Sequence, residues 1–171
     1  MSRVVVELLT KAHDRTSFDC GKQEQNDFLR QRARKHAELN FSKTWVAVQQ
    51  GQSQILGYVT LSMGNVAFEG LTEDLQRQLP RYPMPVLHVG QLATDLSYQG
   101  LGIGSLLLRF AAEKAIEASS TVGCFAIELI AHNKKAFDWY LDRGFSSLLP
   151  GSFRLFQSVK TLRFAQEQAS S

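Results

Sequence analysis

Apolar residues recur along this chain with two different spacings, and these spacings predict a mixed order of strands and helices. Short runs rich in β-branched and aromatic residues indicate strands, which we expect at 4–9, 44–48, 55–63, 86–94 and 124–130. Apolar positions three and four residues apart indicate amphipathic helices, which we expect at 22–39, from about 103 to 118, and at 133–143. Residues 71–79 form either a short helix or an irregular connection, 153–164 contain one or two final strands, and 165–171 form a frayed tail.

The second half of this pattern has a recognisable order. A strand, a glycine-led helix, a second strand and a second helix follow one another between residues 86 and 143. Such a βαβα unit places its two strands in parallel with a right-handed crossover. Asn133 is suited to cap the last helix at its N-terminus, and Gly144 is suited to follow its C-terminus. The sequence therefore predicts an α/β fold with a parallel pair near the middle of the sheet.

Three glycines mark the first strand-to-helix turn of that unit. Gly100, Gly102 and Gly104 lie where the apolar strand gives way to the helix. Glycine has no Cβ, so backbone N–H groups can approach an anion closely at such a turn. The helix that follows adds its own unpaired N–H groups and the positive end of its dipole. The pattern predicts a pyrophosphate-binding cradle formed by Gln99, Gly100, Leu101, Gly102, Ile103, Gly104 and Ser105.

Two other known glycine motifs, the P-loop and the dinucleotide fingerprint, fit these residues poorly. A P-loop needs a lysine after its glycines, and none follows here. If a dinucleotide fingerprint, G-x-G-x-x-G, began at Gly100, its third glycine would fall on Ser105. The run also lies past the middle of the chain, whereas that fingerprint belongs to an early βαβ unit. A turn that merely packs a helix against a sheet remains the simpler alternative.

Composition bounds the class of protein. The chain has 171 residues, of which 44% are hydrophobic and 20% charged, as expected for one ordinary folded domain. It contains no apolar run long enough to span a membrane and no N-terminal apolar segment of signal-peptide length. Its two cysteines, Cys20 and Cys124, are too few for a disulfide framework and lack metal-ligand spacing. We therefore expect a cytoplasmic protein without a metal site.

The net charge of +3 is mild, but one segment concentrates basic residues. Arg30, Arg32, Arg34 and Lys35 fall within six residues, with His36 adjoining. Such a cluster favours a polyanionic partner, or it forms a solvated helix face. Both interpretations remain open from the sequence.

Two motifs resemble one enzyme superfamily. The run Gln99 to Gly104 fits Q/R-x-x-G-x-G/A, and Asn133 to Phe145 fits N-x-x-A-x-x-x-Y-x-x-x-G-F. Together with the strand Leu92-Ala93-Thr94, they resemble the GNAT N-acetyltransferases. The resemblance implies a GNAT domain over residues 1–164, with a splayed, mostly antiparallel sheet flanked by helices. It also implies that acetyl-CoA binds where two parallel strands part.

The resemblance assigns roles to individual residues. Backbone groups of Leu92, Ala93 and Thr94 would pair with the pantetheine arm, and Asn133 and Phe137 would contact the cofactor. Tyr140 would be the general acid, because a phenol is protonated at neutral pH and can give its proton to the departing thiolate. Its alternative is a core aromatic beside Phe137. No general base stands out, since His88 and Glu128 on adjacent strands suit structural roles.

Further stretches resemble one GNAT branch, the toxins of bacterial toxin–antitoxin modules. These stretches are 18–21, 27–33, 42–45, 55–61 and 79–86. The resemblance implies acetylation of the α-amine of aminoacyl-tRNA, a small ribbon-helix-helix-type antitoxin and a homodimer. Phosphate or acceptor contacts would fall to Arg30, Arg34, Lys35 and Arg81. The branch usually carries arginine where this chain has Gln91. Acetylation of a small-molecule or protein amine, and a non-catalytic CoA- or RNA-binding module, are the alternatives.

Overall fold

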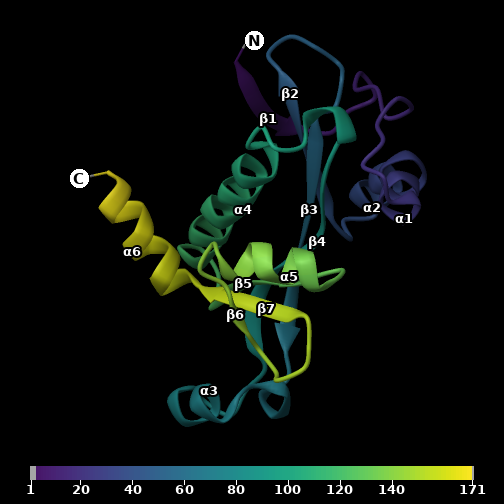
Figure 1. Cartoon of the computed structure of the whole chain (residues 1–171). Coiled ribbons are helices and arrows are strands. Elements are labelled where there is room, and N and C mark those ends of the chain that lie inside the picture. Colours follow the sequence, from purple (N-terminus) through teal and green to yellow (C-terminus); the bar gives the residue numbers. More distant parts are fainter. Residues whose placement is uncertain (1–2, 171) are drawn as a thin grey trace. The chain divides into compact units, whose positions relative to one another are not determined.

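The computed structural model describes residues 3–170, which contain helices and one seven-stranded sheet of order β1-β2-β3-β4-β5-β7-β6 (Figure 1). The strands are β1 Val4–Leu8, β2 Lys43–Gln49, β3 Gly57–Val66, β4 Met84–Thr94, β5 Ala126–Ile130, β6 Ser146–Ser147 and β7 Arg154–Ser158. The helices are α1 Gln23–Asp27, α2 Ala33–Glu38, α3 Glu73–Gln78, α4 Ile103–Ser119, α5 Lys134–Leu141 and α6 Val159–Ala169. The predicted mixed sheet, with mostly antiparallel strands, is confirmed.

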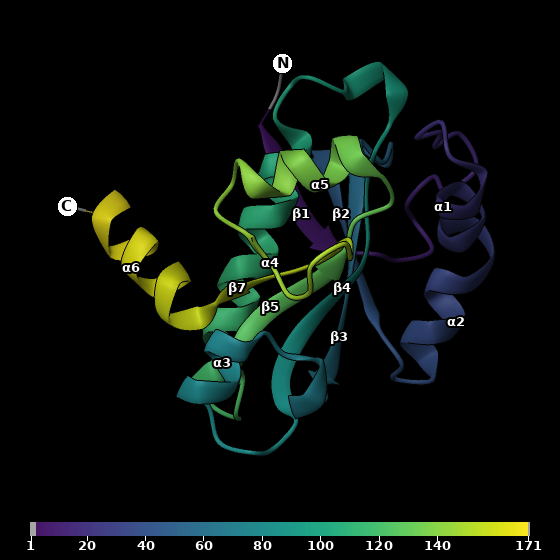
Figure 2. The ribbon, with the colours of Figure 1, turned by 60° about the horizontal axis from the view of Figure 1, so that its bottom comes forward.

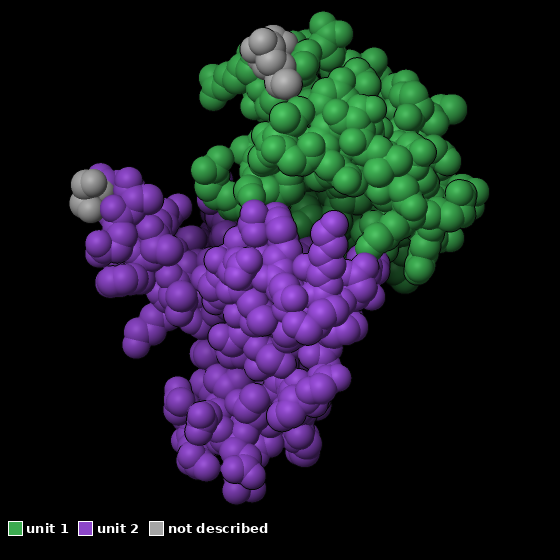
Figure 3. Space-filling model, in the orientation of Figure 1, with its two compact units in different colours: residues 1–62, 90–111 green, residues 63–89, 112–171 purple. Residues whose placement is uncertain are grey.

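The chain divides into two compact units (Figure 3). Unit 1 comprises Met1–Ser62 and Gly90–Ala111, and unit 2 comprises Met63–Val89 and Ala112–Ser171. The division passes through β3, β4 and α4, so each of these elements contributes to both units.

In unit 1, β1, β2 and β3 pair in antiparallel fashion. Their core includes Phe18, Leu29 and Tyr58, all at most 1% exposed. The helix predicted over 22–39 begins one residue later and consists of α1, a π-helical turn η1 (Phe28–Arg32) and α2. A π turn adds a residue to the helical repeat. Here it falls within the segment that buries Phe28, Leu29 and Ala33 in the unit 1 core.

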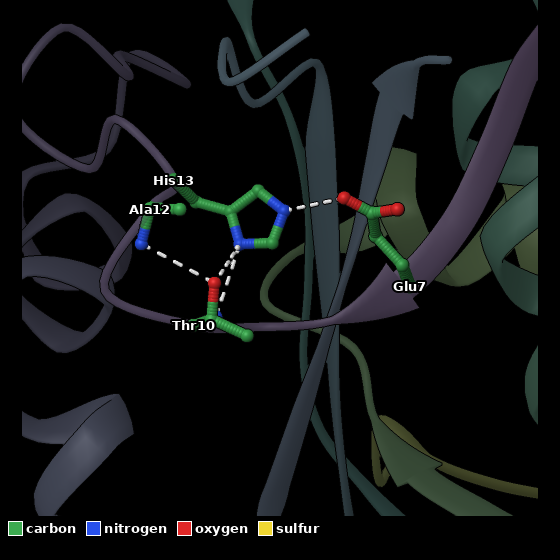
Figure 4. Close-up of polar contacts among 4 residues, drawn as sticks. All are labelled: Glu7, Thr10, Ala12 and His13. Atoms are coloured by element: carbon green, nitrogen blue, oxygen red, sulfur yellow. Dashed lines mark hydrogen bonds and ion pairs between the residues drawn. The ribbon is translucent and has the colours of Figure 1, made fainter. Parts of the chain in front are cut away.

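The turn after β1 is held by a buried histidine (Figure 4). The Thr10 N–H donates to His13 Nδ1 at 3.0 Å, so this ring nitrogen carries no proton. The proton therefore lies on Nε2, which donates to Glu7 Oε1 at 2.7 Å. Both ring nitrogens are occupied in holding the turn, which gives His13 a structural role.

In unit 2, β4 and β5 are parallel, with Val86 opposite Ala126 and Val89 opposite Leu129. This confirms the predicted parallel pair. Strand β5 also pairs with the antiparallel β7, so β5 lies between β4 and β7 (Figure 2). The segment left open at 71–79 contains α3, which follows a short 3₁₀ turn η2 (Phe68–Gly70) and is capped by the Thr72 side chain.

Residues 153–164 contain one final strand, β7, as predicted. The chain after it differs from the prediction, because α6 runs from Val159 to Ala169 through the start of the segment 165–171 that we expected to be a frayed tail. Ser158 caps α6, because its side chain accepts the N–H of Thr161 at 3.1 Å. Val159 and Leu162 are buried three residues apart, which is a helical spacing rather than an alternating one. Ser171 lies outside the described residues.

Candidate functional site

The glycine turn lies between β4 and α4 in unit 1. Strand β4 ends at Thr94, a 3₁₀ turn η3 (Leu96–Tyr98) follows, and α4 begins at Ile103. Gly100 and Gly102 have φ angles of 78° and 86°, which L side chains rarely adopt. An added Cβ would meet nothing within 4 Å at either position. Backbone conformation, rather than crowding, therefore requires glycine there, and the space beside both residues suits a bound anion.

The first turn of α4 supplies the other half of this site. The Leu106 N–H donates to Gly102 O at 3.0 Å and closes the first helical hydrogen bond. The first N–H groups of an α-helix generally lack acceptors within the helix, and the helix dipole places partial positive charge at this end. Gly104 was expected in the turn but lies inside α4, so its N–H belongs to this helical end. Gln99 is exposed, and its side-chain amide donates to Thr94 O at 3.2 Å.

Asp95, which is not among the predicted site residues, anchors the turn. Its carboxylate is buried and accepts the N–H groups of Ser97 at 2.9 Å and Asp19 at 3.0 Å. The backbone adds two bonds, from Asp95 N to Leu56 O and from Leu96 N to Asp19 O. An Asp directly after a strand is a common turn signal that could have identified it, because its side chain can accept the backbone N–H two residues further on.

Strand β4, which leads into the glycine turn, accepts a hydrogen bond from a side chain of α1. Gln25 is 4% exposed, and its Nε2 lies 3.3 Å from both Leu92 O and Gln91 Oε1. Ala93 is buried, whereas Leu92 and Thr94 are half-buried. Gly57 on β3 packs closely against Ala93 and Ile103. A Cβ added at this position would lie 2.8 Å from Ile103 Cγ2 and 2.9 Å from Ala93 O.

Unit 2 holds the second predicted group of site residues, all on or beside α5. Asn133 is the predicted N-cap, and its Oδ1 accepts the Ala136 N–H at 2.9 Å. Phe137 is half-buried, with its ring centroid 5.6 Å from that of Phe153. The side-chain oxygen of Asn133 is thus engaged in capping, which leaves its amide group for a ligand.

Tyr140 has a buried ring on α5. Its centroid lies 5.0 Å from that of Trp139 and 5.5 Å from that of Phe145, both in edge-to-face contact. Burial raises the pKa of Tyr140 above its usual value, and the nearby Arg143 charge opposes only part of this change. The phenol is therefore protonated at neutral pH. This is the state that a general acid requires.

A charged network crosses three strands of unit 2. Glu128 on β5 is 1% exposed and accepts from His88 Nδ1 at 2.6 Å and from Arg154 Nε at 2.7 Å. Burial alone would raise the pKa of Glu128, but the hydrogen bonds and charges of His88 and Arg154 outweigh it and lower that pKa. The expectation that Glu128 is paired is confirmed, although no pattern in the sequence indicates Arg154 as a partner.

The predicted acceptor-binding residues differ in what they contact. The Arg30 guanidinium donates to the backbone carbonyls of Arg15 and Phe18, so it also holds the fold of unit 1. Arg34 is half-buried and Lys35 is exposed, both on α2. Arg81 is exposed in unit 2, with its guanidinium 5.9 Å from the Phe68 ring centre.

Residues 3–170 contain neither a candidate metal centre nor a candidate membrane-spanning helix. The side chains of His, Cys, Asp and Glu form no group of three or more that could hold a metal ion in this part of the chain. None of the helices described is both long and apolar enough to cross a membrane.

A glycine turn that leads into a helix N-terminus is the arrangement of an anion-binding site. The model of the acetyltransferase (GNAT) family matches residues 5–145, and the chain belongs to this family. A tRNA-acetylating toxin of Mycobacterium tuberculosis is 32% identical over 133 residues, which are 78% of each chain.

Solved structures of toxins resemble the whole fold. A tyrosine-to-phenylalanine mutant of KacT has a TM-score of 0.90 at 28% identity, covering 96% of this chain and 99% of the other. AtaT complexed with acetyl-methionyl-tRNAfMet has a TM-score of 0.88 at 27% identity, with the same coverage of 96% and 99%. A mutant AtaT toxin bound to acetyl-CoA and the C-terminus of the antitoxin AtaR has a TM-score of 0.81 at 26% identity, covering 98% and 100%.

Proposed function

We propose that this chain is a toxin that uses acetyl-CoA to acetylate the α-amine of aminoacyl-tRNA and thereby blocks translation. Its membership of the acetyltransferase family supports the reaction. The relatives that acetylate tRNA, or that bind acetyl-methionyl-tRNA, support the acceptor. The observation that carries the proposal is the glycine turn, where two left-handed residues with open space beside them precede a helix N-terminus.

The residues of the turn fit the diphosphate of acetyl-CoA. We assign the diphosphate to backbone groups of residues 99–105, the pantetheine arm to the backbone of 92–94, and further cofactor contacts to Asn133 and Phe137. Backbone N–H groups near Leu92 would stabilise the oxyanion that forms on the thioester carbonyl. Tyr140 would give its proton to the departing sulfur. The catalytic domain would comprise residues 1–164.

The same proposal includes the enzyme's location, its oligomeric state and its macromolecular partners. A cytoplasmic homodimer regulated by a small ribbon-helix-helix-type antitoxin suits such a toxin. The AtaT complex with the C-terminus of AtaR supports the antitoxin. Arg34 and Lys35 would contact RNA phosphates, and Arg81 would lie at the acceptor site. Arg30 would contribute its charge while its donors hold backbone carbonyls.

Transfer from labelled acetyl-CoA to a mixture of aminoacyl-tRNAs tests this function. We expect label on the α-amino group of one or more aminoacyl-tRNAs, together with arrest of translation in a cell-free system. Free amino acids, uncharged tRNA and a lysine-rich protein serve as alternative acceptors in the same assay. If the label goes preferentially to a free amino acid or to the lysine-rich protein, that amine is the acceptor and aminoacyl-tRNA is not. Binding of acetyl-CoA without any transfer would indicate a non-catalytic binding module.

Reversing the charge of Arg34 and Lys35 tests the RNA contact. In R34E/K35E we expect the KM for aminoacyl-tRNA to rise about tenfold. Its salt dependence should become shallower, because a protein that contacts fewer phosphates releases fewer counterions when it binds the RNA. The affinity for acetyl-CoA should not change. The control is K11E/K160E, which reverses the charge of two exposed lysines outside α2. An unchanged KM in R34E/K35E would show that these two residues of α2 do not contact the RNA.

A further inference from the structure

The last residues of β4, all within unit 1, present one backbone edge toward β3 and one away from it. Ala93 O points toward β3, because a Cβ added at Gly57 would lie 2.9 Å from it. The Asp95 N–H points the same way and donates at 2.9 Å to the backbone carbonyl of the residue before Gly57. Backbone groups of successive strand residues face opposite sides. The N–H and C=O groups of Leu92 and Thr94 therefore face away from β3, along the edge that we assign to the pantetheine arm.

Side-chain amides cap both carbonyls of this edge. Gln25 Nε2 lies 3.3 Å from Leu92 O and 3.3 Å from Gln91 Oε1. Gln99 Nε2 donates to Thr94 O at 3.2 Å. A backbone carbonyl can only accept, so Gln25 turns its NH2 group toward Leu92, and the two protons of that group serve the two acceptors.

The two amides differ in how firmly they are held. Gln99 is exposed, so its amide can leave Thr94 O when a ligand takes its place. Gln25 is 4% exposed, and its Oε1 lies 3.8 Å from Cys20 Sγ. Its backbone carbonyl accepts the hydroxyl of the fully buried Tyr58 at 2.7 Å. Gln25 is therefore a fixed part of the edge.

We propose that Gln25 is a positioning residue for acetyl transfer, whose amide caps Leu92 O so that the Leu92 N–H can stabilise the negative oxygen that forms on the thioester. This rests on the proposed acetyl transfer. The N–H and C=O groups of one strand residue lie side by side. An oxygen bound to the Leu92 N–H is thus also near the Leu92 carbonyl, whose partial negative charge repels it. The NH2 group of Gln25 offsets this repulsion with its own partial positive charge.

The repulsion is strongest while charge develops on the oxygen. As the amine nitrogen bonds to the acetyl carbon, one electron pair of the C=O bond moves onto the oxygen, and it returns when the C–S bond breaks. The nitrogen loses one proton and the sulfur gains one, so the protons balance. Interactions that strengthen only in the transition state raise kcat rather than substrate affinity. Gln25 should therefore act on kcat more than on the affinity for acetyl-CoA.

Gln25→Met tests the amide, because methionine has a similar length but no N–H donor. We expect kcat of Q25M to be about tenfold or more below wild type, while the Kd for acetyl-CoA stays within about twofold. The second measurement is infrared spectroscopy of acetyl-CoA labelled isotopically at the acetyl carbonyl. Donors that polarise this carbonyl lower its stretching frequency. The decrease on binding should be smaller in Q25M than in wild type.

Tyr58→Phe is the matched control. It removes a buried hydrogen bond to the backbone of Gln25 but leaves the amide in place. Both variants should melt at a lower temperature than wild type, because each loses a buried hydrogen bond. The kcat and the infrared shift of Y58F should nevertheless equal those of wild type. An equal loss of kcat in Y58F and Q25M would overturn the inference, because Gln25 would then act through the stability of the fold.

Gln25→Glu tests the same role through pH, since a carboxyl group donates only when it is protonated. Burial and the two oxygen acceptors should raise the pKa of a carboxyl group at this position. We expect the kcat of Q25E relative to wild type to rise about fivefold or more between pH 8 and pH 6. The same ratio for Q25M should not change with pH. A reduced ratio that is constant with pH in Q25E would contradict the role of the donor.

The ionisable groups around Gln25 do not account for such a change. Burial raises the pKa of the Cys20 thiol and of the Tyr58 phenol, so both stay neutral between about pH 6 and pH 8. Residues 90–94 of β4 contain no ionisable side chain. Wild type and variants share the charged residues of α1 and the turn before it, so the ratio of kcat values removes their titration. These residues are Asp19, Lys22, Glu24 and Asp27.

Failure of this inference is distinct from failure of the proposed function. If Q25M keeps the kcat and the infrared shift of wild type, Gln25 is not a positioning residue, even though the enzyme acetylates aminoacyl-tRNA. If wild type acetylates another amine instead, kcat is measured with that amine. The infrared measurement needs only acetyl-CoA, so it decides the role of Gln25 even where no amine is acetylated.

Discussion

Tyr140→Phe should lower kcat by about 100-fold or more while the affinity for acetyl-CoA stays within about twofold. The substitution removes the proton that the leaving thiolate would receive, and general acids contribute rate factors of this size. The ring itself remains, so the edge-to-face contacts with Trp139 and Phe145 remain as well. The measurements are release of free thiol at saturating substrates and calorimetric titration with acetyl-CoA.

Tyr82→Phe is the matched control for this substitution. Tyr82 is 73% exposed, so loss of its hydroxyl should alter neither quantity. Because the pKa of Tyr140 is raised by burial, we also expect no loss of wild-type activity from its ionisation up to about pH 10. Undiminished turnover in Y140F would leave Tyr140 as a core aromatic, with solvent protonating the thiolate.

The elements that the sequence predicts well are those in which several local signals agree. Around α5, the capping residue Asn133, the apolar spacing and Gly144 all indicate one short helix, and Gly144 has the expected positive φ of 92°. The glycine turn is similar, since the strand before it and the helix after it both have strong periods. Here propensity and packing favour the same structure.

The prediction fails where local signals are ambiguous or partners are distant. The apolar residues after Ser158 fit a strand or a helix, and short runs of this kind cannot be assigned from their period alone. The π turn in the helical segment leaves no compositional mark. Arg30 has the charge of a phosphate contact, but its backbone acceptors lie in a loop that only the fold brings to it.

The candidate site divides in the same way. The glycine turn carries its chemistry in a few consecutive residues, so the sequence alone predicts an anion site there. Tyr140 needs the family resemblance, because its spacing also fits a core position. The network around Glu128 depends on strand register, since His88 lies 40 residues before it and Arg154 lies 26 residues after it. No local pattern predicts such a register.

Gly102→Glu should weaken acetyl-CoA binding by about 100-fold. A carboxylate about 5 Å from the diphosphate repels it by about 3 kcal/mol at an effective dielectric constant near 20, and each 1.4 kcal/mol is tenfold in affinity. Isothermal titration with acetyl-CoA at low and high salt measures the effect. The repulsion should weaken in high salt.

The chain offers a control with the same backbone strain. Gly51, in the β2–β3 turn, has a φ of 79° and, like Gly102 at 86°, no atom within 4 Å of an added Cβ. Gly51→Glu therefore carries a similar conformational cost of about 1–2 kcal/mol for a left-handed residue, and both variants should lose similar thermal stability. Only Gly102→Glu should lose acetyl-CoA. If both variants bind it like wild type, the diphosphate lies elsewhere, and the glycine turn serves only to join β4 to α4.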